Sequence, residues 1–325
     1  MRPITVSVGA LATASATKIS ASQAVPGATA IVIDGAAATG YSATAIATTT
    51  SNGAGTTTVT LNGARSMTIN SATVAYLTTP AQVVLVSAGD DSTKTWTVAG
   101  LLSDGVTAVT ETVAAANTSR VATTNLFRQV NSVTLSAASA GNVSVGTNGV
   151  AVLDLARRVI LTSGGADTGL TFTVYGTDRV GNAISEAITG ASGGAASTVL
   201  DYKTVTKITS SGATASTLTV GTNGVSGSGW VYVDPWAMSQ ISLQATVVGT
   251  VNYSVQSTLD DPNDPTNAVA AASMTWVDSN DTAVVGATAT KQSNFAYPPK
   301  YIRVLLNSGT GSVTLTVNQP LSAVF

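Results

Sequence analysis

The chain has 325 residues, of which only 9% are charged, and its 14 basic and 16 acidic side chains leave a net charge of −2. Globular proteins carry about 25% charged residues, so we expect a largely neutral surface, and the scattered basic residues argue against nucleic-acid binding. The sequence has no Cys and no His, which excludes disulfides, thiolate metal sites and Ser-His-Asp catalysis.

The beginning of the chain gives no sign of a membrane segment. No apolar stretch approaches the roughly 18 residues of a spanning helix, so we expect no membrane partner. Met1 to Leu11 hold one basic residue and several small residues, interrupted by Thr and Ser. Such a stretch is weak as a secretory signal.

Residues 1–73 form a leader rich in Ala, Thr and Ser. We predict an N-terminal arm with a few strands, and Ile31 to Gly35 is its clearest strand and turn. Thr57 to Leu61 alternates polar and apolar residues, and this two-residue period is typical of half-buried strands.

A tandem repeat follows the leader. Thr95 to Val98 returns as Thr171 to Val174, at an offset of 76 (171 − 95), and Gly146 to Val150 returns at an offset of 75 (221 − 146). We therefore predict two β-sandwich repeats, over residues 74–149 and 150–228. Chains built by stacking one module usually form surfaces or spacers.

Residues 229–325 hold most of the aromatic side chains. Their size suits an eight-stranded jelly roll or a similar sandwich. The predicted fold class is therefore all-β: tandem Ig-like β-sandwich modules followed by a C-terminal jelly-roll-like β-sandwich. We expect tight turns with positive φ at five dipeptides: Asn52-Gly53, Asn62-Gly63, Asp104-Gly105, Gly181-Asn182 and Asn223-Gly224.

Carboxylate chemistry is sparse. The two Glu residues, Glu111 and Glu186, occupy equivalent places in the repeats, since their numbers differ by 75 (186 − 111). We interpret them as structural rather than as the acid and base of a glycosidase. The acidic run Asp260 to Pro265 lacks the spacing of a calcium loop, and an exposed rigid turn explains it better. We predict no catalytic residue, no metal site and no cofactor.

The remaining polar and aromatic residues allow two interpretations each. The dispersed lysines, Arg157-Arg158 and the acidic pair Asp90-Asp91 are interpreted as solvent-facing edge or hairpin residues; the alternative for the basic ones is contact with an acidic patch of a partner. The rings of the last domain are expected to pack in its core, with sugar stacking as the alternative.

Several motifs occur in an order similar to that of virion structural proteins of tailed bacteriophages. They are Arg157 to Ser163, Thr171 to Asp178, Gly181 to Glu186, Val220 to Gly224, Thr250 to Ser257, Asp260 to Pro262, Phe295 to Pro299 and Ser308 to Val317. The resemblance covers residues 74–325, and the first repeat departs most, with Gln82 in place of Arg158. It implies a place in a virion and no enzymatic residues.

We therefore expect a structural component of the virion exterior, a head decoration or head/neck fibre protein and not an enzyme. Its partners would be capsid, portal/connector or tail proteins, and a homo-oligomer, favoured as a trimer, would dock through the arm or the first repeat. The alternative is a receptor- or glycan-binding adhesin with exposed rings among Trp230, Trp236, Tyr253, Trp276 and Tyr297. A glycoside hydrolase would need two carboxylates facing across one cleft.

Overall fold

The computed structural model describes residues 2–51, 57–234 and 241–319. Within these ranges the chain consists of β-strands in antiparallel sheets and two 3₁₀-helices, η1 (Ala271–Ser273) and η2 (Thr282–Val284). None of the helices in the described part is long and apolar enough to cross a bilayer. The all-β sandwich fold class predicted from the alternating pattern is confirmed.

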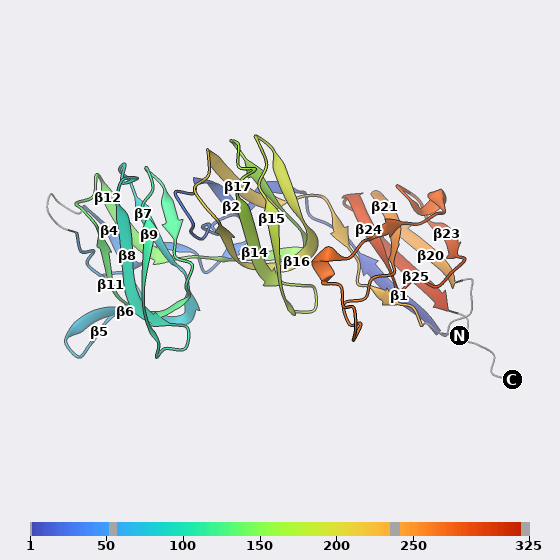
Figure 1. Cartoon of the computed structure of the whole chain (residues 1–325), viewed down its shortest axis with the longest axis horizontal. Coiled ribbons are helices and arrows are strands. Elements are labelled where there is room, and N and C mark those ends of the chain that lie inside the picture. The colour runs from blue at the N-terminus through green and yellow to red at the C-terminus, as the bar shows by residue number, and fades with distance from the viewer. Residues whose placement is uncertain (1, 52–56, 235–240, 320–325) are drawn as a thin grey trace.

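Three sandwiches lie in a row (Figure 1), and we call them the distal sandwich, the middle sandwich and the jelly roll. The distal sandwich contains β4 (Ser42–Ser51), β5 (Ser66–Ile69), β6 (Ala72–Ala81), β7 (Val83–Ser87), β8 (Thr95–Leu102), β9 (Ala108–Ala114), β10 (Arg120–Ala122), β11 (Phe127–Leu135) and β12 (Asn142–Thr147). The middle sandwich contains β2 (Ser15–Ala24), β3 (Ala38–Thr39), β13 (Val150–Ser163), β14 (Thr171–Thr177), β15 (Ala183–Thr189), β16 (Ala195–Ser210) and β17 (Thr217–Thr222). The jelly roll contains β1 (Arg2–Val8), β18 (Ser226–Gly227), β19 (Val231–Tyr232), β20 (Ile241–Val248), β21 (Val251–Thr258), β22 (Val277–Asp278), β23 (Lys291–Phe295), β24 (Tyr301–Gly309) and β25 (Ser312–Gln319).

The distal and middle sandwiches are two copies of one architecture. The order β9-β8-β11-β6 and β10-β7-β12-β4 in the distal sandwich corresponds to β15-β14-β16-β13-β17-β2 in the middle one, where the single long strands β13 and β16 replace the broken pairs β6/β7 and β10/β11. Equivalent large side chains fill both cores, because Trp96 and Phe172 are both fully buried, as are Phe127 and Tyr202. The tandem repeat of the sequence is therefore a structural repeat.

The leader supplies strands to all three sandwiches, one to the jelly roll and two each to the middle and distal sandwiches. β1 pairs with β25 in the jelly roll, β2 with β17 in the middle sandwich and β4 with β12 in the distal sandwich. Residues 1–73, predicted as an arm with a few strands, thus contain β1 to β5, which are built into all three sandwiches. The chain runs outward through the row and returns through it, so β1 and β25 lie together at one end (Figure 1).

The leader also contains a repeat of its own. Ser15-Ala16-Thr17-Lys18-Ile19 returns as Ser42-Ala43-Thr44-Ala45-Ile46, at an offset of 27 (42 − 15). Ile19 and Ile46 are fully buried at the centre of the two leader strands β2 and β4. A glycine of the following turn donates its N–H to each of them, Gly35 to Ile19 O (2.8 Å) and Gly63 to Ile46 O (2.9 Å).

Because of these strand pairings, the distal sandwich is inserted within the chain of the middle one, and both are inserted within the chain of the jelly roll. In the distal sandwich β5 and β6 form a hairpin whose turn residues Asn70 and Ser71 have positive φ (49° and 64°). The equivalent strands of the middle sandwich, β3 and β13, pair in the same way, with Thr39 opposite Val150. The whole distal sandwich therefore occupies the place of a hairpin turn of the middle one.

The jelly roll contains both other sandwiches in the connection between its first two strands. In chain order its strands are β1, β18/β19, β20, β21, β22, β23, β24 and β25, and its sheets follow the orders 1-8-3-6 and 2-7-4-5. This is the strand order of a jelly roll. Residues 9–225 are the connection from strand 1 to strand 2. Its core includes the fully buried Tyr253 and the nearly buried Phe295.

Two glycines show how closely the leader strands approach the repeats. A Cβ on Gly146 in β12 would lie 1.7 Å from Ser42 O, and one on Gly221 in β17 would lie 1.9 Å from Ser15 O. Any larger residue would push the leader strand off the sheet. Gly146 and Gly221 are the first residues of the two Gly-Thr-Asn-Gly motifs that reveal the tandem repeat. Glycine is required at both positions because a leader strand passes so close to them.

Not every turn forms as predicted. Gly105 and Gly181 adopt positive φ (72° and 93°), as expected. Gly63 and Gly224 do not lie in the left-handed region, and Gly63 is instead needed because a Cβ would lie 2.5 Å from Thr44 O. Asn52-Gly53 lies outside the described residues.

The segment Ile31 to Gly35, predicted as strand and turn, is a buried connection rather than a ladder strand. It passes between the distal and middle sandwiches, where Ala30 bridges Ala122 on one side and Thr209 on the other. Asn148 satisfies its backbone, because Asn148 Oδ1 accepts from Ile33 N (2.6 Å) and Asn148 Nδ2 donates to Ile31 O (3.2 Å). Side-chain amides replace a neighbouring strand here.

We expect the fragment 42–147 to fold alone, because it contains all strands of the distal sandwich in one continuous stretch. The fragment 74–149 is the bare repeat and lacks β4 and β5, so β12 loses a neighbour and the core loses Ile46. Thermal unfolding followed by circular dichroism should show a cooperative transition for the first fragment only. A cooperative transition in the shorter fragment would mean that the leader strand is dispensable.

Candidate functional site

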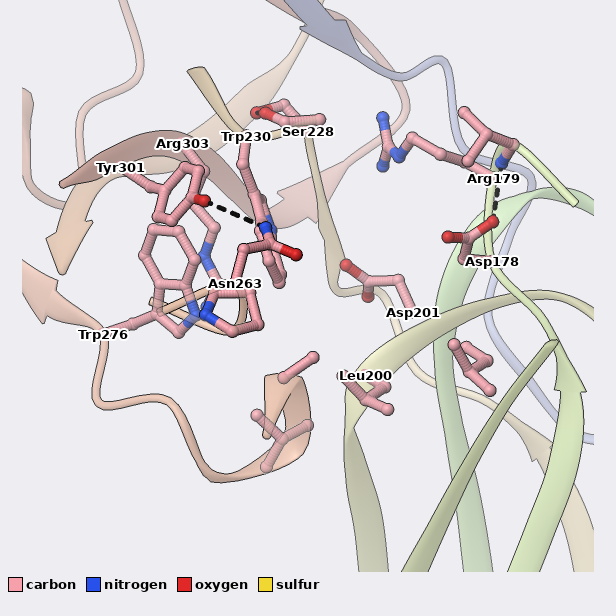
Figure 2. Close-up of a pocket in the computed structure, with 16 residues that line it drawn as sticks. Asp178, Arg179, Leu200, Asp201, Ser228, Trp230, Asn263, Trp276, Tyr301 and Arg303 are labelled. Carbon is pink, nitrogen blue, oxygen red and sulfur yellow. Dashed lines mark hydrogen bonds between the residues drawn. The ribbon is translucent and has the colours of Figure 1, made fainter. Parts of the chain in front are cut away.

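A cleft of about 450 Å³ lies between the middle sandwich and the jelly roll. The middle sandwich contributes the turn after β14, with Asp178 and Arg179, and the centre of β16, with Asp201. The jelly roll contributes Trp230, the loop at Asn263, Trp276, and Tyr301 and Arg303 from β24. Figure 2 shows the rings and Arg303 on one side of the cleft and Asp178, Arg179 and Asp201 on the other.

Aromatic rings form the jelly-roll wall of the cleft. The ring centroid of Trp230 lies 5.4 Å from that of Trp276 and 5.8 Å from that of Tyr301. Tyr301 is only 8% exposed, and its hydroxyl donates to Asp261 Oδ1 (3.0 Å). Trp230 and Trp276 are half-buried. The wall therefore presents partly open indole rings held by a fixed tyrosine.

Arg303 is a nearly buried cation behind this wall. Its side chain stacks on Trp276, with Cζ 4.0 Å from the ring centroid, and its Nε donates to Gln256 Oε1 (3.0 Å). The residue is 5% exposed. Burial lowers the pKa of Arg303 to about 10, although the negative charge of Asp201 opposes this shift.

Asp201 is the acidic group of the cleft. Its Oδ2 accepts from Gly227 N (2.8 Å), whereas its Oδ1 is buried without a hydrogen-bond partner. Burial raises the pKa of Asp201 to about 6, and the hydrogen bond from Gly227 and the charges of Arg158, Arg303 and Arg179 only partly offset it.

The charges of the cleft are not matched by ion pairs. Among the described residues, no arginine nitrogen lies within 4.0 Å of a carboxylate oxygen of Asp201. Arg179 donates to Gly227 O, and its pKa is lowered by burial. Three arginines thus act on Asp201, and Asp178 is a second carboxylate beside Arg179, so positive charge exceeds negative charge by one where the middle sandwich meets the jelly roll.

The prediction that Arg157 and Arg158 face solvent is wrong for Arg157, and Arg158 is half-buried. Arg157 is fully buried, where its guanidinium donates to Ala12 O (2.8 Å) and lies 3.3 Å from Asp154 Oδ2. Arg158 contributes to the charge around Asp201. The register of β13 against β16 shifts between Val152 and Arg157, so the simple alternation of faces fails there.

The two glutamates hold equivalent bends in the separate repeats. Glu111 accepts from Thr124 N (2.5 Å) and Asn125 N (3.0 Å), and Glu186 accepts from Val199 N (2.8 Å) and Leu200 N (2.9 Å). Glu111 lies in the distal sandwich and Glu186 in the middle one. The two carboxylates therefore do not face each other across one cleft.

The acidic run Asp260 to Pro265 forms a turn in which backbone and side-chain donors occupy the carboxylates. Asp260 accepts from Thr275 N (2.5 Å), Asp261 pairs with Lys300 Nζ (2.7 Å), and Asp264 accepts from Thr266 N (2.9 Å). In the described part of the chain, no group of three His, Cys, Asp or Glu residues could hold a metal ion.

The other predicted contact residues are scattered. Lys94 and Lys300 form ion pairs, Lys203 donates to Leu153 O (2.8 Å), and Lys207 lies 4.5 Å over the ring of Tyr175. These four lysines belong to three different sandwiches.

Of the rings proposed for sugar contact, only Trp230 and Trp276 meet at the cleft. Tyr253 is fully buried in the jelly-roll core, which agrees with the favoured prediction of core packing and contradicts the exposure that the adhesin alternative expects for this ring. Tyr297 is 47% exposed beside Phe295. Trp236 and Phe325 lie outside the described residues.

Sequence reasoning missed Arg179, Asp201 and Arg303 as site residues. The departures between the repeats hold a signal for this face. Where the second repeat has Arg158, the first has Gln82 (158 − 76), and where it has Asp201, the first has Leu126 (201 − 75). New charges at equivalent positions mark the face that meets the jelly roll.

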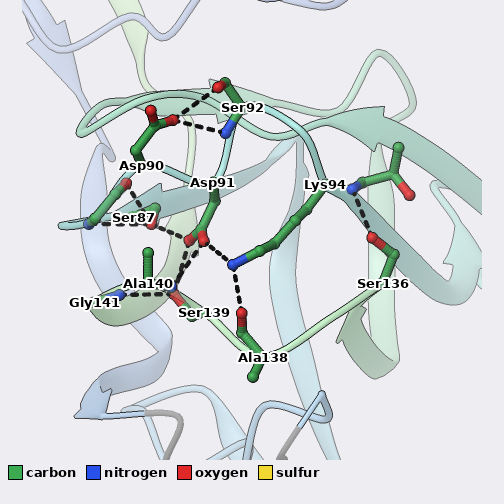
Figure 3. A network of polar contacts seen from close by, with 12 residues as sticks. Ser87, Asp90, Asp91, Ser92, Lys94, Ser136, Ala138, Ser139, Ala140 and Gly141 are labelled. Atoms are coloured by element: carbon green, nitrogen blue, oxygen red, sulfur yellow. Dashed lines mark hydrogen bonds and ion pairs between the residues drawn. The ribbon is translucent and has the colours of Figure 1, made fainter. Parts of the chain in front are cut away.

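A second cluster of charged groups, in the distal sandwich, is structural (Figure 3). Asp91, predicted as an exposed hairpin residue, is fully buried. It accepts from Lys94 Nζ (2.5 Å), Ser87 Oγ, Ser139 Oγ (2.7 Å) and Ala140 N (2.8 Å). Burial alone would raise the pKa of Asp91, but the hydrogen bonds, from Lys94 first, lower it to about 2. The network ties the β7–β8 turn to the segment before β12.

We expect Asp91→Asn to lower the free energy of unfolding by about 3 kcal/mol at pH 7, because Lys94 loses its partner. Asp167 is the matched control, since it is 1% exposed at the equivalent place (91 + 76) and accepts only from Ala215 N (2.7 Å). Asp167→Asn should change stability by no more than about 1 kcal/mol. Urea denaturation followed by circular dichroism measures both. Equal effects would show that the lysine pair contributes nothing.

Asp201 should contribute a pH dependence of stability that is opposite in sign to that of Asp91, because the pKa of Asp201 is raised and that of Asp91 is lowered. Burial raises the folded pKa of Asp201 to about 6, above the ordinary value of 3.8 for an aspartate. The folded state therefore holds the proton more tightly, and the contribution of Asp201 to stability falls as pH rises from about 4 to 6. We expect Asp201→Asn to gain in stability relative to the unsubstituted chain over this interval. Urea denaturation at pH 4 and pH 7.5 tests this, and a relative loss would mean that the arginines outweigh burial.

Comparison with protein-family models, with curated proteins and with solved structures found no match to the chain. The resemblance to virion proteins therefore stays a prediction.

Proposed function

We propose that the chain is a structural component of a tailed-phage virion, exposed on the particle exterior as a head decoration or head/neck fibre protein. The observation that carries this proposal is the row of three nested sandwiches with β1 and β25 paired at one end (Figure 1). A row of this kind extends a surface outward from one attachment point. The chemistry of the surface supports the same role, because only 9% of residues are charged.

The structure changes how docking is proposed. The sequence predicts a leader that reaches a partner as an arm, but the leader strands complete the sandwiches of the same chain. We propose instead that one end of the row docks on the capsid, the portal/connector or a tail protein and the other end projects. Contacts repeated by a homo-oligomer, with a trimer favoured, would add through multivalency.

We propose no enzymatic activity for this chain. The two glutamates are held by backbone N–H groups in different sandwiches. A glycosidase of the usual kind needs two carboxylates about 5 to 9 Å apart. The cleft is lined by two carboxylates, Asp178 and Asp201, but both lie on the middle-sandwich side (Figure 2), and Asp178 already accepts from Val180 N (2.9 Å) and Asn182 N (2.9 Å).

The proposal predicts that the chain is present in purified particles. Mass spectrometry of the particles should detect it, and cryo-electron microscopy should show a three-lobed density on the head, neck or tail. Mass measurement of the purified chain should give a trimer or a higher oligomer. Absence of the chain from washed particles would reject the proposal, and a monomeric mass would reject the oligomer.

A second candidate function is a receptor- or glycan-binding module, and the cleft favours it. Trp230 and Trp276 are half-buried and meet within 5.4 Å in a cleft of about 450 Å³. Partly open aromatic rings beside polar groups are typical of small-molecule pockets. This candidate is compatible with the first, because surface components of a particle are placed where receptors are met.

A further inference from the structure

We propose that the cleft between the middle sandwich and the jelly roll binds a sugar that carries a carboxylate, such as a uronic acid residue of an acidic polysaccharide. The inference rests on the glycan-binding candidate and specifies its ligand. The carboxylate would lie at Arg303 and Arg179, and the apolar face of the sugar ring would pack against Trp230 and Trp276 (Figure 2).

The first argument is the unpaired cation. Arg303 is 5% exposed, and no carboxylate oxygen within the described residues lies within 4.0 Å of its nitrogens. A buried charge is costly unless it is paired. The planar guanidinium binds a carboxylate through two parallel hydrogen bonds, so an acidic ligand would supply the missing partner.

The second argument is the excess of positive charge. Arg158, Arg179 and Arg303 all act on the carboxylate of Asp201, and Asp178 adds a second carboxylate beside Arg179, so three cations face two anions. The chain as a whole has a net charge of −2, so a local excess of cations contrasts with the rest of the molecule. An anion in the cleft balances this excess. The Asp201 carboxylate disfavours a doubly charged phosphate more than a singly charged carboxylate, and this argues for the latter.

The third argument is the aromatic wall with polar groups beside it. Tyr301 is fixed by Asp261 and Asn263, and its ring holds Trp230 at a centroid distance of 5.8 Å. Asn263 also lines the cleft, is exposed, and carries a side-chain amide that can hydrogen-bond to hydroxyl groups. A volume of about 450 Å³ is at the lower end of the range of ligand pockets, which suits one or two sugar rings.

The test uses the full chain and isothermal titration calorimetry. The probes are sodium glucuronate and a short oligouronate, with glucose as the neutral partner of matched shape and inorganic phosphate as the anion without a ring. We expect the uronates to bind at least about tenfold more tightly than glucose and phosphate, because a charge-assisted hydrogen bond contributes about 1.5 to 3 kcal/mol.

Variants connect binding to the cleft. Arg303→Gln and Trp230→Ala should each weaken uronate binding at least about tenfold. Arg128 is the matched control, because it also lies over an aromatic ring, with Cζ 5.1 Å from the centroid of Tyr76, but in the distal sandwich. Arg128→Gln should leave binding unchanged. If thermal unfolding shows that Arg303→Gln does not fold, Arg179→Gln replaces it, since Arg179 is less buried.

The outcomes separate this inference from the candidate on which it rests. Equal binding of glucuronate and glucose, weakened by Trp230→Ala, would keep a glycan site and overturn the acidic ligand. Equal binding of phosphate and uronate would reduce the cleft to an anion site and overturn the sugar. No binding of any probe at about 10 mM, or uronate binding unaffected by the cleft variants, would overturn both the ligand and the glycan-binding candidate. The virion proposal would stand in each case.

Discussion

The structure depends on one constraint: the part of the chain after the leader lacks a strand in each of the three sandwiches. Each needs a strand from the leader: β1 for β25, β2 for β17 and β4 for β12. Without it β25, β17 or β12 would become the edge strand of its sheet, and a core position such as Ile19 or Ile46 would be empty. Because one leader serves all three sandwiches, the domains are joined twice rather than once. The order of the row follows from this threading.

The chain crosses twice between neighbouring sandwiches, and these two crossings hold the two walls of the cleft in place. Residues 9–14 and 223–225 both pass between the middle sandwich and the jelly roll. Arg157 anchors the first crossing through Ala12 O (2.8 Å), and Asp201 anchors the second through Gly227 N (2.8 Å). Two tethers resist rotation more than one flexible linker would. The rings of the jelly roll and the arginines of the middle sandwich are thereby held at the same cleft.

The tandem repeat is sufficient to predict the sandwiches, because alternating Thr and Val residues define strands locally. The threading of the leader is not predictable in this way, although Ser-Ala-Thr at residues 15 and 42 repeats within it. Strand partners distant in sequence leave no local pattern, and a leader rich in Ala and Thr resembles a flexible arm. The burial of Arg157 escapes prediction for a different reason, since a shift of register in β13 changes which face a side chain occupies. The sequence therefore gives only part of the candidate site, namely the rings of Trp230 and Trp276 and the departure of Asp201 from the first repeat, whereas the meeting of these residues at one cleft depends on the threading.

The two repeats differ in charge where each meets the next sandwich. At the seam between the distal and middle sandwiches, Gln82 donates to Thr123 O (2.8 Å) and accepts from Asn148 Nδ2 (2.8 Å), and both partners are neutral. At the seam with the jelly roll, the equivalent Arg158 joins the charges around Asp201. The first arrangement satisfies the amide of Gln82 and only connects. The second leaves Arg303 without a carboxylate and one oxygen of Asp201 without a donor, among the described residues. A seam that serves only as a joint gains nothing from unpaired charge, and this difference is why we propose a ligand at the second seam and none at the first.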